Sequence, residues 1–103
     1  MSRFLSNYVI GYNGRVVRNA VVTLDDANVL LSVAPIDAEL ASVRYVAAPV
    51  LVVARCDLLR AVTLVGGITD VGELSSLLSQ AALTPVIEGQ TRCALVVCDG
   101  APR

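Results

Sequence analysis

An apolar run without alternation lies in the middle of the chain, and it constrains the fold more than any other feature. Val50 to Ala54 contains no polar residue. A strand with one solvated face alternates apolar and polar side chains, whereas a strand covered on both faces is continuously apolar. We therefore predict an interior strand at Val50–Ala54. Proline cannot donate to a sheet ladder, so Pro49 should either separate this strand from another at Val43–Ala47 or break a single strand that contains both segments.

Turn residues divide the flanking sequence into further strands. Asn13-Gly14 favours a tight reversal after a first strand, and the polar segment Asp25–Asn28 favours a second one. Pro35 ends the strand that follows. The predicted strands are Arg3–Ile10, Ala20–Leu24, Val29–Val33 and, near the end of the chain, Thr91–Cys98.

One segment has clear helical signals. Asp70 can cap a helix and Glu73 stands at the capping-box spacing. An apolar stripe at helical spacing follows: Val71, Leu74, Leu77, Leu78 and Ala81. The segment Asp57–Gly67 fits helix and strand equally, and Ile36–Ser42 is a connector with room for one helical turn.

These elements predict one mostly-β domain over residues 1–103. Its fold class is α+β: a small β-sandwich or partly closed barrel with one packed helix, in which the N- and C-terminal strands share a sheet. A chain of 103 residues holds one core. Since 55% of its residues are hydrophobic and only 17% are charged, part of the apolar surface should stay exposed. We expect a homodimer, or another protein partner, to cover it.

The charged residues exclude several classes of function. All eight positive charges are arginine, and the chain has no histidine, lysine or tryptophan. A net charge of −1 argues against nucleic-acid binding. The apolar runs are too short to cross a membrane, and the first residues lack the apolar core of a signal peptide. We therefore expect a cytoplasmic protein that binds neither nucleic acid nor membrane.

The segment Pro49–Leu58 resembles a segment of the amidohydrolase superfamily that leads from a small β-domain into a metal-binding barrel. The family pattern there is Pro-Gly-Leu-Val-Asn-Ala-His-x-His-Leu. Arg55 and Asp57 occupy the positions of the two metal-binding histidines. Arginine cannot ligate a cation, and one carboxylate does not build a catalytic zinc site. The resemblance thus implies a degenerate site without a metal.

The flanking segments are similar to the same family. Arg18–Asp26 resembles its N-terminal hairpin, and Glu88–Asp99 resembles its C-terminal strand pattern. Only Leu59–Ile68 stands in place of the barrel, which typically has about 250 residues. The resemblance therefore implies the small composite β-domain of an amidohydrolase from which the catalytic barrel is missing.

From these observations we expect a non-catalytic structural or interaction domain that self-associates and has no cofactor. The alternative is a module that binds a small anion in an apolar cleft, with Arg44, Arg55 and Asp57 as the ligand-binding residues, because an arginine fork suits a carboxylate or phosphate. An enzyme that uses Cys56 or Asp57 ranks last, since the sequence shows no base–nucleophile pair.

Overall fold

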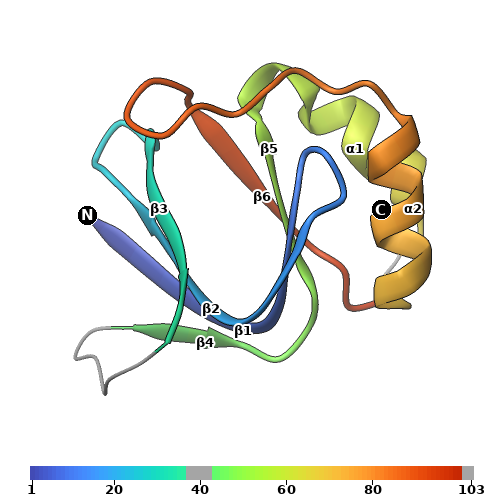
Figure 1. Ribbon diagram of the computed structural model, residues 1–103, viewed down its shortest axis with the longest axis horizontal. Coiled ribbons are helices and arrows are strands. Elements are labelled where there is room, and N and C mark those ends of the chain that lie inside the picture. The colour runs from blue at the N-terminus through green and yellow to red at the C-terminus, as the bar shows by residue number, and fades with distance from the viewer. Residues whose placement is uncertain (37–42, 101–103) are drawn as a thin grey trace.

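The computed structural model describes residues 1–36 and 43–100. Within these residues the chain forms six strands, one short 3-10 helix and two α-helices (Figure 1). In chain order they are β1 (Ser2–Gly11), β2 (Val16–Leu24), β3 (Leu30–Pro35), β4 (Arg44–Val46), β5 (Val50–Ala54), η1 (Arg55–Asp57), α1 (Leu58–Val65), α2 (Val71–Gln80) and β6 (Cys93–Val97). Neither α-helix is long and apolar enough to cross a membrane within the described residues.

The strands form a single curled sheet in the order β3-β2-β1-β5-β6, with β4 paired to the first half of β1. β1 pairs in parallel with both β4 and β5, and the other pairings are antiparallel. The sheet curls until Val29 forms an isolated bridge with Arg92. It is a partly closed barrel rather than a complete one. The predicted mostly-β fold, with N- and C-terminal strands in one sheet, is confirmed.

Strand β5 is the centre of the structure, as its continuous apolar sequence predicts. Each of its five residues is at most 2% exposed. Leu51 and Val53 face one core cluster, which also contains residues of α1 and α2, while Val52 faces a second cluster inside the curl of the sheet. The predicted break at Pro49 is confirmed, because β4 and β5 are separate strands.

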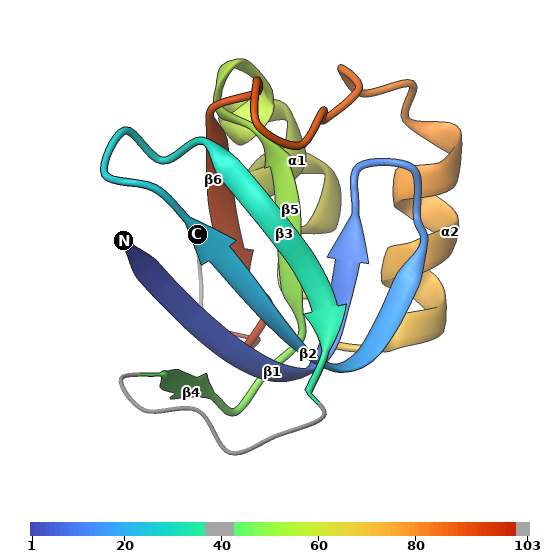
Figure 2. The same cartoon turned by 60° about the vertical axis from the view of Figure 1, so that its left-hand side comes forward.

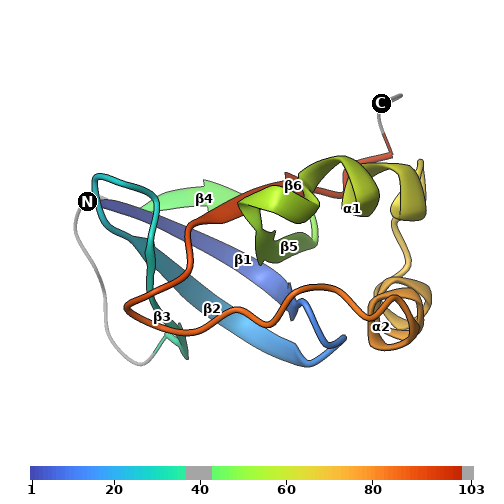
Figure 3. The ribbon, with the colours of Figure 1, turned by 90° about the horizontal axis from the view of Figure 1, so that it is seen from above.

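Both helices lie at the same end of the sheet (Figure 3). Helix α2 begins as predicted at Asp70, whose side chain accepts a hydrogen bond from the backbone N–H of Glu73 at 2.9 Å. A second helix, α1, occupies the segment for which the sequence left helix and strand open. Ala61 and Val65, four residues apart, are both buried against the core. This packing favours the helix.

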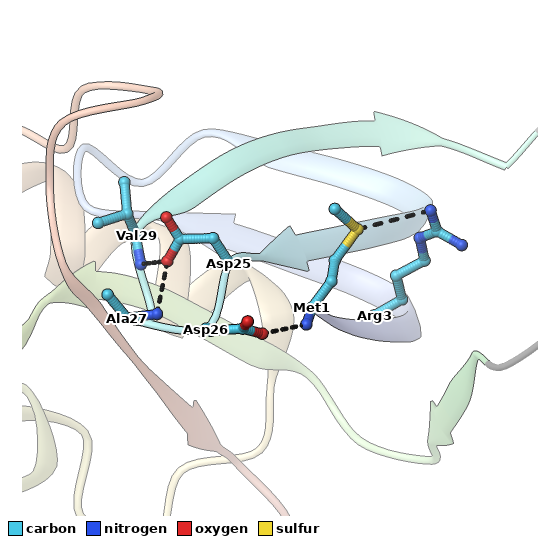
Figure 4. Close-up of polar contacts among 6 residues, drawn as sticks. All are labelled: Met1, Arg3, Asp25, Asp26, Ala27 and Val29. Atoms are coloured by element: carbon cyan, nitrogen blue, oxygen red, sulfur yellow. Dashed lines mark hydrogen bonds and ion pairs between the residues drawn. The ribbon is translucent and has the colours of Figure 1, made fainter.

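The β2–β3 turn is held by its own acidic residues (Figure 4). The carboxylate of Asp25 accepts hydrogen bonds from the backbone N–H groups of Ala27 and Val29, at 2.8 and 2.9 Å. The Met1 amine donates a hydrogen bond to Asp26, and this bond and its positive charge lower the pKa of that exposed carboxyl. The adjacent acids thus form the predicted turn. The predicted helical turn at Ile36–Ser42 falls on residues 37–42, outside the described residues.

Candidate functional site

A cleft opens where the curled sheet fails to close. At one end the barrel is held shut by the hydrogen bond from the Cys93 N–H to the Asn28 carbonyl, at 2.8 Å. Among the named strands β6 pairs only with β5, so no hydrogen-bond ladder joins it to the first half of β1 (Figure 2). The cleft between them has a volume of about 520 Å³. We call it the β6 cleft. It is lined by Ser2, Phe4, Leu24, Asn28, Arg44, Val46, Val50, Arg55, Leu58, Cys93, Ala94, Leu95 and Val97.

Two of the three residues predicted to bind an anion line this cleft. Arg44 is the first residue of β4, and Arg55 directly follows β5. Both are exposed. The guanidinium carbon of Arg44 lies 6.0 Å from the centroid of the Phe4 ring, at the outer limit of a cation–π contact. Within residues 1–36 and 43–100, no carboxylate lies within ion-pairing distance of either guanidinium group. Their charge is available to a ligand.

Most of the wall between the two arginines is apolar. Phe4 and Leu24 stand on one side, and Leu95 and Val97 on the other. Such a wall removes the non-polar part of a ligand from water, while a guanidinium group holds its charged end. The chemistry therefore suits a molecule or segment that combines apolar groups with an anion.

Asp57, the third predicted residue, does not line the β6 cleft. Its carboxylate is buried, accepts a hydrogen bond from the backbone N–H of Thr84 at 2.7 Å, and lies 3.6 Å from the guanidinium of Arg60. A 3-10 helix has three residues per turn, so side chains two residues apart in η1 point in different directions, and Asp57 does not share the cleft with Arg55. Through its contacts with Thr84 and Arg60, Asp57 instead connects the segment after α2 to α1.

Replacing Asp57 by alanine should destabilise the fold without weakening binding in the β6 cleft. The backbone N–H of Thr84 would lose its acceptor, which costs about 1–3 kcal/mol. Asp57→Asn keeps an acceptor and loses only the ion pair with the exposed Arg60, so its cost should stay below about 1 kcal/mol. Urea unfolding of the two variants measures this difference. Equal losses would contradict the assigned role.

The thiols differ in their environment. Cys56 is exposed, and its sulfur lies 3.8 Å from the hydroxyl oxygen of Thr84. Cys93 and Cys98 are buried. Burial raises the pKa of the Cys93 thiol, an effect that a hydrogen bond with the Leu30 backbone partly offsets. Cys93 therefore contributes to the wall of the cleft as a protonated, weakly nucleophilic group at neutral pH.

A second cleft, of about 390 Å³, opens at the other side of the curl. Its lining includes Arg15 and Glu88, so it carries both signs of charge. The charged residues of the β6 cleft are both arginines. The β6 cleft is thus the better candidate for an anionic ligand. The sequence predicted an apolar cleft but not the residues of its wall, because Phe4 and Leu95 are brought together only by the curl of the sheet.

Metal-ligating side chains do not gather in the described part of the chain: no group of three or more cysteines and carboxylates is placed to hold an ion. The comparisons add no relative. No protein-family model, no curated protein and no solved structure matches this chain. The resemblance to amidohydrolases therefore rests on the residues of the chain itself.

Proposed function

We propose that this chain is a non-catalytic interaction domain that recognises an anionic group in the β6 cleft. The observation that carries the proposal is that Arg44 and Arg55 line one apolar cleft and have no carboxylate partner among the described residues. An arginine fork can bind a carboxylate or a phosphate with two parallel hydrogen bonds. Cysteines that are present as thiols fit a cytoplasmic setting, which we include in the proposal.

A free small acid is the alternative occupant. The volume of about 520 Å³ falls in the range of small-ligand sites, about 300–1,000 Å³. In both cases the anion meets the same two arginines. The small acid therefore serves as the first probe, and a protein segment that carries the same group is considered separately below.

We also propose that the domain descends from the small composite β-domain of an amidohydrolase. Its first and last strands lie in one sheet, as the resemblance implies. Helix α1 stands at the point where the barrel would begin, directly after Arg55 and Asp57.

Octanoate tests the anion site, because it joins a carboxylate to an apolar chain. We expect Arg44→Gln and Arg55→Gln each to weaken octanoate binding roughly 5-fold, the equivalent of about 1 kcal/mol for a partly exposed charge pair. Arg18→Gln is the matched control, since Arg18 is exposed on β2 and does not line the cleft. Calorimetric titration measures the three affinities. An equal loss in all three variants would show that the attraction is not specific to the cleft.

Self-association is a second proposal, favoured by the exposed apolar pair on α1. Leu59 is 82% exposed and its neighbour Leu58 is 37% exposed. Burying such side chains against a second copy would remove them from water. We expect sedimentation equilibrium at high concentration to show a dimer, and Leu59→Gln to weaken it. A strict monomer throughout the concentration range would remove this proposal and leave the anion site untouched.

A further inference from the structure

The hydrogen-bond ladder between β5 and β6 shows which backbone groups of β6 point away from β5. Antiparallel pairs alternate between bonded and non-bonded positions. The Arg55 N–H donates to the Arg92 carbonyl at 2.9 Å, and the Cys98 N–H donates to the Pro49 carbonyl at 2.8 Å. With the register Val50↔Val97 to Ala54↔Cys93, both bonds place the even-numbered residues of β6 in the bonded positions.

The N–H and C=O groups of Cys93, Leu95 and Val97 therefore point to the outer edge of β6. The Cys93 N–H is already used there, since it donates to the Asn28 carbonyl. The outward N–H groups of Leu95 and Val97 have no backbone partner within the part of the chain that the structure describes. Both residues line the β6 cleft. The cleft thus offers two free backbone donors in addition to its two arginines.

Within the described residues, this edge lacks three of the usual protections against strand pairing. Natural edge strands carry charges, prolines or bulges that block the addition of another strand. Cys93–Val97 has no charged residue and no proline, and its register with β5 is regular. The three consecutive residues Cys93, Ala94 and Leu95 all line the cleft, so the cleft follows the edge of the strand rather than one face.

Arg55 stands at the Cys93 end of this edge, whereas Arg44 lines the same cleft from β4, which pairs with Phe4–Ser6 of β1. Arg44 opens β4, and Arg55 follows the last residue of β5. The start of β4 and the end of β5 lie at opposite ends of the sheet (Figure 2). An occupant that lies along β6 would therefore meet the charge of Arg55 at its Cys93 end and the charge of Arg44 on the β4 side of the cleft.

We propose that the β6 cleft binds an extended acidic peptide segment, which adds to the outer edge of β6 as a further strand. The inference rests on the proposed function, because it names the partner of the same site. The peptide backbone would pair with Leu95 and Val97, and its carboxylates would bind Arg44 and Arg55. A small acid has no backbone that could continue the strand ladder along both N–H groups. Twofold pairing with β6 of a second copy would bring like-charged arginines together along one edge.

The probe is a capped six-residue peptide of alternating valine and threonine with a glutamate at each end, about 20 Å long when extended. At saturation we expect amide hydrogen exchange at Leu95 and Val97 to slow at least 10-fold. Replacing both glutamates by glutamine should weaken binding at least 5-fold. Methylating the alternate peptide nitrogens that face β6 should abolish it, while methylating the other set should not.

A protein variant tests the same edge. Val97→Pro removes an outward N–H that β5 does not use, and Val97→Ala is the control that loses the side chain alone. We expect the peptide to bind the proline variant at least 10-fold more weakly than the alanine variant. If the proline variant does not fold, the two methylated peptides decide the question on the unaltered protein.

The outcomes separate the two proposals. Strand addition is overturned if none of the peptides binds, if exchange at Leu95 and Val97 does not change, or if both methylated peptides bind like the parent. Octanoate binding that needs Arg44 and Arg55 would then leave the proposed anion site standing. Loss of octanoate binding as well would overturn both.

Discussion

Replacing Gly14 by alanine is expected to lower the free energy of unfolding by about 2–5 kcal/mol. Gly14 has φ +86°, and an alanine there pays about 1–2 kcal/mol for the left-handed backbone. A Cβ at this position would also lie 2.4 Å from the Ser75 carbonyl oxygen, on helix α2. Overpacking of this kind costs about 1–3 kcal/mol more. Urea unfolding measures the total.

The close contact at Gly14 results from the packing of the β1–β2 turn on helix α2. The Ser75 hydroxyl donates a hydrogen bond to the Gly14 carbonyl at 2.5 Å, so the β1–β2 turn is packed directly on α2. Gly89→Ala is the matched control. Gly89 has φ +78° and no atom within 4 Å of an added Cβ, so its replacement should cost only the backbone part, about 1–2 kcal/mol. Equal losses of unfolding free energy at the two glycines would show that a Cβ at position 14 does not clash with α2.

Leu51→Ala is the second large effect, with an expected loss of about 2–5 kcal/mol. Leu51 is fully buried at the centre of β5, in the cluster that joins the sheet to both helices. Truncation would leave a cavity between β5, α1 and α2, because these packed elements can relax into the space only partially. For a domain of this size, about 1 kcal/mol shifts the melting temperature by roughly 4–8 °C, so thermal unfolding shows the loss directly.

Leu59→Ala is the control for this substitution, because the same atoms are removed from a side chain that is 82% exposed. Its effect on stability should stay within about 0.5 kcal/mol. A comparable loss at Leu59 would mean that α1 is already covered in solution, as in the proposed dimer, and its dependence on protein concentration would identify that case.

Local patterns account for most of the fold. The continuous run of β5, the Asp25 turn and the Asp70 cap each act within a few residues, and the strand, the turn and the helix start that they predict are present. Helix α1 could not be predicted, since its sequence satisfies both periodicities. The choice is made by tertiary packing, where Ala61 and Val65 reach the buried face of the sheet.

The candidate site, like the fold, could be predicted from the sequence only in part. Arg44 and Arg55 could be singled out from the sequence, but the cleft that joins them depends on how far β1 and β6 curl toward each other. Asp57 could not be placed, because a spacing of two residues puts side chains on one side of a strand but on different sides of a 3-10 turn. The free donors of Leu95 and Val97 follow from strand register, which no local pattern determines.

The arginine side chains offer the most direct measurement of the central claim. The chain has eight arginines and no lysine, so the Nε–Hε signals in a nitrogen–proton correlation spectrum form a small set. On titration with octanoate we expect the signals of Arg44 and Arg55 to move together with one dissociation constant, while that of Arg18, which does not line the cleft, stays in place. Equal shifts in all the arginines, or no shift at Arg44 and Arg55, would contradict an anion site in the β6 cleft.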